Sequence, residues 1–204
     1  RYPLVTGVQT CALPISRSPV REALLQLEAE GIIEHRPQSG VYLREVSPQE
    51  LEELYDMREL IEPYAAERAA RLASPAQLEQ IRGVCDEVTA IARQPRLVHW
   101  LESAKNRRRL SMLDIEFHAT ILAAAQNRVA RRFFENAQII SLVVSWNHFQ
   151  AEPDALAKRV VPTAQQHRAI YDAIKKRAAV RARTLMRSHI SGMAKRVLAD
   201  IGGR

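Results

Sequence analysis

Apolar residues recur at helical spacing along most of this chain, and only one short region near its beginning shows strand-like segments. Residues 16–31 place their apolar positions on one helical face, and Gly31 is well suited to end that helix. Residues 32–36 and 41–46 then indicate two short strands, joined by a turn that ends at Gly40. A helix followed by a β-hairpin is typical of the end of a winged-helix domain.

A second domain is expected to begin at Ser47, after which no strand pattern follows. The sequence Ser47-Pro48-Gln49-Glu50 is a capping box that opens a long helix, and Ser74 begins the next one. Further helices are expected over residues 98–104, 107–125, 128–149, 162–177 and 179–201. The predicted fold class is therefore mostly α: a partial winged helix-turn-helix at residues 16–46, then an all-α bundle of about six to seven helices at residues 47–204.

The first fifteen residues follow neither a helical nor an alternating pattern. Residues 5–15, with the sequence VTGVQTCALPI, resemble an in-frame translation of a common short-read sequencing adapter. We therefore expect residues 1–15 to be a non-native or disordered tail, in which Cys11 has no functional role.

Composition narrows the class of protein without changing this picture. Hydrophobic residues make up 47% of the 204 residues, and only 7 Gly and 10 Pro interrupt the chain, which excludes collagen-like and low-complexity proteins. Two cysteines cannot form a disulfide scaffold, and no apolar run approaches the roughly 20 residues of a membrane-spanning helix. We expect no association with a membrane and a location in the cytoplasm.

The net charge of +7 is weak evidence for nucleic-acid binding, because the excess of basic residues lies outside the region that resembles a winged helix. Up to Val46 the chain carries five basic and five acidic residues, so this part of the chain has no net charge. The excess positive charge lies in the helical region, where a solvated helix face is the ordinary explanation.

Four polar residues interrupt the apolar helix faces and are the strongest candidates for chemistry. Asp114 and His118 lie four residues apart within one apolar stripe, so their side chains are neighbours. His167 and His189 each lie on the apolar stripe of a later helix. Because buried imidazole and carboxylate groups need partners, we expect these four residues to bind one divalent metal ion.

Zinc is the first choice for that ion, with nickel or manganese as alternatives, because three imidazoles and one carboxylate suit borderline divalent metals. A metal-dependent helical-bundle enzyme acting on a small organic acid is one possible function. However, no nucleophile motif, phosphate-binding loop or general acid or base accompanies the four residues, so we assign no catalytic residues and favour ligand sensing over catalysis.

The sequence also resembles a known family. The segment SRSPVREAL at residues 16–24, with the later Ser39-Gly40-Val41, is similar to the recognition helix and wing of GntR-family transcription regulators. The helical region resembles the ligand-binding FCD domain of their FadR-type subgroup. The residues that carry this second resemblance are Arg58, Glu62, Asp114, Phe117, His118, Asn127, His167 and His189.

This resemblance implies a metabolite-responsive regulator, a repressor or an activator with repression as the first choice, that binds operator DNA as a homodimer. It implies that Arg17, Arg21 and Arg36 contact DNA, and that Gly40 lets the tip of the wing approach the minor groove. It also implies a small carboxylate effector at the metal. Arg58 could bind that carboxylate or could pair internally with an acidic residue such as Glu62.

One departure from the family affects the DNA-binding expectation. A winged helix needs two further helices beneath the recognition helix, and residues 1–15 stand where those helices would be. We therefore expect this polypeptide to bind its operator weakly or not at all, although the natural full-length protein would bind it.

Overall fold

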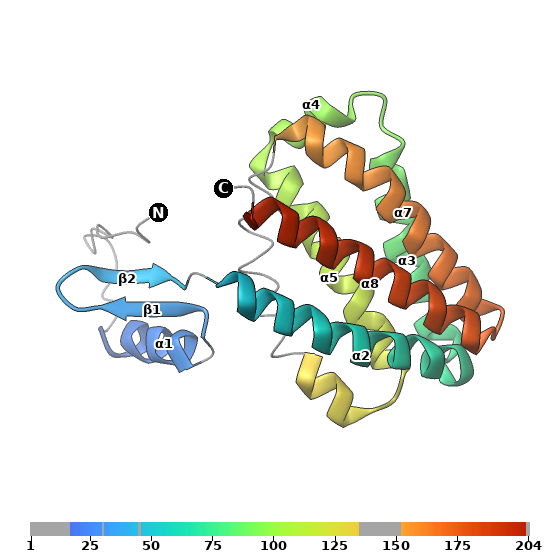
Figure 1. Cartoon of the computed structure of the whole chain (residues 1–204), viewed down its shortest axis with the longest axis horizontal. Coiled ribbons are helices and arrows are strands. Elements are labelled where there is room, and N and C mark those ends of the chain that lie inside the picture. Colours follow the sequence, from blue (N-terminus) through green and yellow to red (C-terminus); the bar gives the residue numbers. More distant parts are fainter. Residues whose placement is uncertain (1–16, 30, 45, 135–151, 203–204) are drawn as a thin grey trace.

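The computed structural model describes residues 17–29, 31–44, 46–134 and 152–202. Helices dominate these residues, which confirms the mostly-α fold class, and a two-stranded sheet lies near the beginning of the chain (Figure 1). The expected tail at residues 1–15 lies outside the described residues. Within the described part of the chain, no helix is both long enough and apolar enough to cross a membrane.

The beginning of the described chain has the predicted helix and hairpin. Helix α1 (Arg17–Ala29) is followed by the antiparallel strands β1 (Ile33–Arg36) and β2 (Gly40–Leu43). Gly31 ends α1 with a φ of 72°, which a residue with a side chain adopts only at a cost. Gly40 follows the turn with a φ of 101°, so glycine is also required at the tip of the hairpin.

The remaining helices form one bundle. Their bounds are α2 (Pro48–Leu72), α3 (Pro75–Ala92), α4 (Leu97–Glu102), α5 (Ala104–Ala124), α7 (Pro153–Lys175) and α8 (Ala179–Gly202). Capping boxes at Ser47 and Ser74 begin α2 and α3, as their sequences predict. Residues 128–134 are also helical, whereas the remainder of the helix expected over residues 128–149 lies outside the described residues.

One predicted boundary was clearly wrong. The helix expected to begin near Pro162 begins at Pro153 instead and runs through Pro162 to Lys175. Both prolines fit the first turn of a helix, where no intrahelical N–H bond is needed, so the sequence allowed either start. The observed start adds more than two turns to α7, and those turns contribute Leu156 and Val160 to the core.

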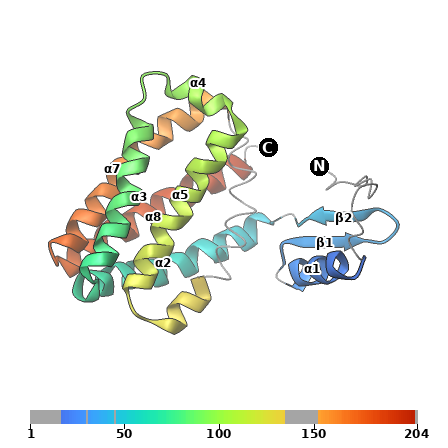
Figure 2. The ribbon, with the colours of Figure 1, turned by 180° about the vertical axis from the view of Figure 1, so that it is seen from behind.

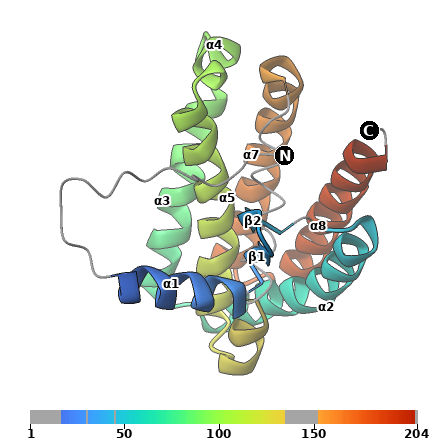
Figure 3. The same ribbon diagram turned by 90° about the vertical axis from the view of Figure 1, so that its left-hand side faces the viewer.

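The helices that carry the four candidate metal ligands pack around the core of the bundle. Helix α2 packs along α8, and both contact α7, while α5 packs against α2 and α3 (Figures 2 and 3). Its largest fully buried side chains include Phe117, Leu51, Ile170, Met186 and Ile190. The four helices α2, α5, α7 and α8 therefore enclose a common interior, into which polar groups can project only if they find partners.

Candidate metal centre

The four residues predicted from the apolar stripes lie together inside the bundle. One potential ligand atom from each of Asp114, His118, His167 and His189 lies within 4.8 Å of the other three. The three histidines are 1% exposed, whereas Asp114 retains partial access to solvent with 26% of its side chain exposed. The cluster is therefore a buried set of nitrogen ligands with an oxygen ligand at its accessible side.

The distances between the ligand atoms suit a single ion at their centre. Nε2 of His189 lies 3.3 Å from Nε2 of His167 and 3.4 Å from Nε2 of His118. Nε2 of His167 lies 3.5 Å from Oδ1 of Asp114. Ligands that share one zinc ion at 2.0–2.1 Å in tetrahedral geometry lie roughly 3.3–3.4 Å apart. The cluster could therefore hold a metal ion without large movement.

The protons on the histidines also favour a cation at this point. Nδ1 of His189 lies 2.8 Å from the amide oxygen of Gln166, and Nδ1 of His118 lies in ion-pair contact with Glu62. Amide and carboxylate oxygens only accept hydrogen bonds, so Nδ1 of each ring donates to its partner and Nε2 of each ring is directed at the centre of the cluster. These Nε2 atoms lie 3.4 Å apart, so a cation between them could be bound by both rings.

Burial favours the neutral, metal-binding form of His167 and His189. Loss of hydration lowers the pKa of His167 and His189 well below its usual value, and the neighbouring His118 lowers both further. The ring of His167 also stacks on Phe117, with ring centroids 3.8 Å apart. Neutral imidazoles in fixed orientations are the form in which histidine serves as a ligand.

A buried ion pair supports the cluster from α2. Nε of Arg58 donates to Oε1 of Glu62 at 2.6 Å, while the other carboxylate oxygen of Glu62 lies against His118. Burial alone raises a carboxyl pKa, but Arg58 and His118 outweigh it and lower the pKa of Glu62 to about 2. Glu62 is therefore ionised and orients His118, as carboxylates commonly orient metal-bound histidines.

Arg58 forms the internal ion pair with Glu62 that was one of the two alternatives expected from the sequence. It is 6% exposed, pairs with Glu62 and lies over the ring of Tyr55, 5.1 Å from its centroid. A role in binding an effector carboxylate is untested by these contacts and stays a prediction.

The residues predicted to contact DNA lie on the helix and hairpin as expected. Arg21 is exposed on α1, and Arg17 begins that helix, although its side chain lies outside what the structure describes. Arg36 on β1 pairs with Glu34 and lies 4.8 Å from the centroid of the Tyr42 ring. Their contacts with DNA remain predictions.

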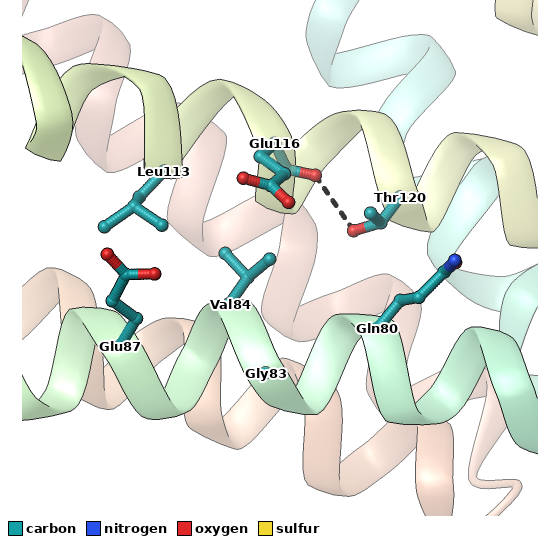
Figure 4. Close-up of a pocket in the computed structure, with 7 residues that line it drawn as sticks. All are labelled: Gln80, Gly83, Val84, Glu87, Leu113, Glu116 and Thr120. Carbon is teal, nitrogen blue, oxygen red and sulfur yellow. Dashed lines mark hydrogen bonds between the residues drawn. The ribbon is translucent and has the colours of Figure 1, made fainter.

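A surface groove between α3 and α5 is a poorer candidate for a ligand site. Its lining includes Gly83, Glu87, Glu116 and Thr120, and none of its lining residues belongs to the metal cluster (Figure 4). Glu87 forms a two-fold hydrogen bond with Arg109, and Thr120 donates to the backbone oxygen of Glu116. The Glu87 carboxylate and the Thr120 hydroxyl are thus engaged within the protein rather than directed at a ligand.

Comparison with known proteins decides the family. Residues 53–192 match the family described as the FCD domain, and residues 11–43 match bacterial regulatory proteins of the gntR family. This chain belongs to the GntR family of transcription regulators and carries an FCD domain. The family consists of regulators rather than enzymes, so the metal-dependent enzyme considered from the sequence is not retained.

Individual relatives agree with this assignment. An uncharacterised HTH-type transcriptional regulator of Agrobacterium vitis is 28% identical over 116 residues, which cover 55% of this chain and 62% of that protein. This chain therefore spans less than two thirds of that relative. The HTH-type transcriptional repressor RspR of Escherichia coli is 26% identical over 185 residues, 90% of this chain and 74% of the repressor.

A solved structure shows the same fold. The E. coli protein McbR/YncC superimposes with a TM-score of 0.75 over 92% of this chain and 87% of its own chain, at 16% sequence identity. At that identity the likeness establishes the fold alone.

Three residues near the cluster were not predicted as part of the site from the sequence. Gln166 holds His189, and Tyr55 and Arg196 contribute to the electrostatics of the site. Arg196 offered one signal, since it follows His189 by seven residues and thus shares its helix face. Gln166 gave no such signal, because its contact depends on how α7 packs against α8.

Proposed function

We propose that this chain is a metabolite-responsive transcription regulator whose FCD domain binds a divalent metal ion and, through it, a small carboxylate. The observation that carries the proposal is the convergence of three Nε2 atoms and one carboxylate oxygen inside the bundle. Zinc fits this ligand set first, and nickel or manganese also accept it. We place residues 16–46 in the DNA-binding domain and residues 47–204 in the sensing domain.

The ligand set explains how a carboxylate would be recognised. When bound, a metal ion would act as a Lewis acid for carboxylate oxygens at coordination positions that the four residues do not fill. Asp114, the one partly exposed ligand, marks the side from which the effector enters. Arg58 supplies positive charge nearby, either directly or through Glu62.

Operator binding is assigned to α1 and the hairpin. Arg17 and Arg21 on α1 would contact phosphates or base edges in the major groove, and Arg36 would support contacts made by the hairpin. Gly40 has the positive φ that allows the backbone of the tip to approach DNA closely. The name of the relative RspR supports repression as the direction of control. Such a regulator acts in the cytoplasm, where its operator is.

The partner in this function is a second copy of the chain. Met57, Leu60 and Tyr64 form an exposed apolar stripe on α2, beside the exposed Val129 and Phe133. The two segments are joined by a hydrogen bond of 2.9 Å from the Asn127 amide to the Tyr64 hydroxyl. We name these five side chains the α2 patch, and an apolar patch of this kind is a typical protein interface.

Charges beside the α2 patch favour self-association. Glu53 and Asp56 are exposed on α2, and Arg128 and Arg132 are exposed on residues 128–134. In a two-fold dimer the acidic edge of one copy meets the basic edge of the other, as isologous interfaces require.

The proposal is tested by combining metal analysis with a ligand screen. Protein is purified without added metal, its metal content is measured, and small carboxylates are screened by thermal shift with and without the chelator EDTA. We expect carboxylates to raise the melting temperature only in metal-loaded protein, because a ligand of the folded state stabilises it. Equal shifts in metal-free protein would contradict the proposed mode of binding.

A further inference from the structure

We infer that Arg44 is a positioning residue, which joins the end of α1 to the start of α2 and thereby fixes the orientation of α1 relative to the helical bundle. This inference rests on the DNA-binding role proposed for α1 and adds the residue that orients that helix. It is carried by the hydrogen bonds of Arg44 and by the position of its partners.

Arg44 lies directly after the hairpin and contacts two helices' ends at once. Its Nε donates to the backbone oxygen of Gly31 at 2.9 Å, and its Nη1 donates to Oε1 of Glu50 at 2.6 Å. Gly31 follows the last turn of α1, and Glu50 lies in the first turn of α2. In Figure 1 this junction lies where α1 and the hairpin meet the beginning of α2. One guanidinium therefore bridges the two helices.

Both partners of this guanidinium are held in place by their own elements. The backbone N–H of Arg44 donates to the carbonyl of Ile32 at 3.0 Å, which fixes Arg44 beside the end of α1. On the other side, Oε2 of Glu50 accepts the backbone N–H of Ser47 at 3.3 Å as part of the capping box. Glu50 thus uses one carboxylate oxygen to begin α2 and the other to hold Arg44. A rotation of α1 relative to α2 would break at least one of these bonds.

The chemistry of the contact suits orientation more than stability. The hydrogen bond from Arg44 is the largest cause that lowers the pKa of Glu50, so the contact is charge-assisted. A guanidinium has donors at fixed angles and can serve a carboxylate and a carbonyl together, which an ammonium group does less well. The two side chains are 28% and 37% exposed. Ion pairs with that much solvent contact contribute little to the free energy of unfolding.

Helix α2 connects this contact with the interior of the bundle. Val46, two residues after Arg44, packs against the bundle core. Glu62, which contacts His118, lies on α2 twelve residues after Glu50, about 18 Å along the axis. A displacement of α2 near Glu62 would therefore reach α1 through Glu50 and Arg44.

The test measures the distance between α1 and the bundle by double electron–electron resonance. Spin labels are attached at Ala23→Cys on α1 and Ser188→Cys on α8, which are exposed positions. The background is Cys11→Ser, in which the buried Cys85 is not labelled. Labelled chains are diluted with unlabelled protein, so that label pairs within one chain dominate. We expect a single narrow distance distribution for this parent protein.

Two single variants and their double variant test the contact. Arg44→Gln removes the guanidinium, whereas Glu50→Gln removes the charge and keeps the capping box, because glutamine also serves at that position. We expect each variant to at least double the width of the distribution. The double variant should be no broader than either single variant, because all three lose the same contact. The melting temperature should fall by no more than about 2–4 °C, and circular dichroism should show unchanged helical content.

Glu52→Gln is the matched control for these variants. Glu52 is exposed on α2, two residues after Glu50, and its substitution should leave the distribution unchanged. An unchanged width in Arg44→Gln would overturn the inference. So would a double variant whose broadening equals the sum of the two single effects, or a parent distribution as broad as that of the variants. None of these measurements uses a metal ion, an effector or operator DNA, so their failure would leave the proposed function standing.

Discussion

Nε2 of His118 and Nε2 of His189 face each other at 3.4 Å, although α5 and α8 bring them together from positions 71 residues apart. The Nδ1 atom of each ring lies against an acceptor, Glu62 or Gln166. Two desolvated imidazoles that direct their Nε2 atoms at each other form a site at which a metal ion would find two nitrogen ligands. The folded chain therefore maintains a preformed ligand set, which a metal ion would stabilise.

The carboxylate of Glu62 should control metal affinity without contacting the metal. Glu62→Gln removes the charge that orients His118 and leaves Arg58 buried without its partner. We expect the metal dissociation constant to rise 10- to 100-fold, the usual effect of losing such an outer partner. Competition with a chromophoric zinc chelator measures it.

Glu116→Gln is the matched control for that experiment. Glu116 lies on α5, two residues before His118, but its side chain is exposed. Its substitution should leave metal affinity unchanged. Equal affinities of Glu62→Gln and the wild type would show that Glu62 does not support the centre.

Most of the site, but not all of it, could be predicted from the sequence. His118, His167 and His189 stand on apolar stripes, and burial of polar side chains without partners is costly, so their convergence follows from local pattern. The contact of Gln166 with His189 and the pairing of Arg58 with Glu62 depend on how the helices cross and on which rotamers pack. The helical period of the sequence does not encode either. The start of α7 was ambiguous for another reason, because Pro153 and Pro162 are equally acceptable in a first turn.

Dimerisation through the α2 patch predicts the effect of a charge on it. Leu60 is 67% exposed in the single chain, and Leu60→Glu would place a carboxylate within the proposed interface, beside the acidic edge of α2. We expect the dimer dissociation constant to rise at least tenfold in sedimentation equilibrium, with helical content unchanged. Val180, at 73% exposure, lies near the start of α8 and is not one of the five residues of the patch, so Val180→Glu is the control. A dimer that is equally stable in both variants would rule out this face.

Cys85 should be unreactive while the protein is folded. It is fully buried on α3, and burial raises the pKa of its thiol to about 12. Raising the pH from 7 to 9.5 should therefore not accelerate its alkylation by iodoacetamide, because the reactive thiolate does not form in the folded state. In urea-unfolded protein the thiol has an ordinary pKa, near 8.5, and should react rapidly over that range.

Mass spectrometry of the peptide that contains Cys85 distinguishes this residue from Cys11. A Cys11→Ser variant provides a chain with a single thiol. Alkylation of the folded variant that increases with pH as for a free thiol would contradict the buried position of Cys85.

The most direct test of the account is the metal content of the protein. Wild-type chain and the variant His118→Ala/His189→Ala are purified in parallel, equilibrated with equimolar zinc, desalted and analysed by inductively coupled plasma mass spectrometry. Because the double variant removes two of the four ligands, we predict close to one zinc ion per wild-type chain and almost none in the variant. Absence of metal from both proteins, or equal amounts in both, would contradict a metal centre at these residues.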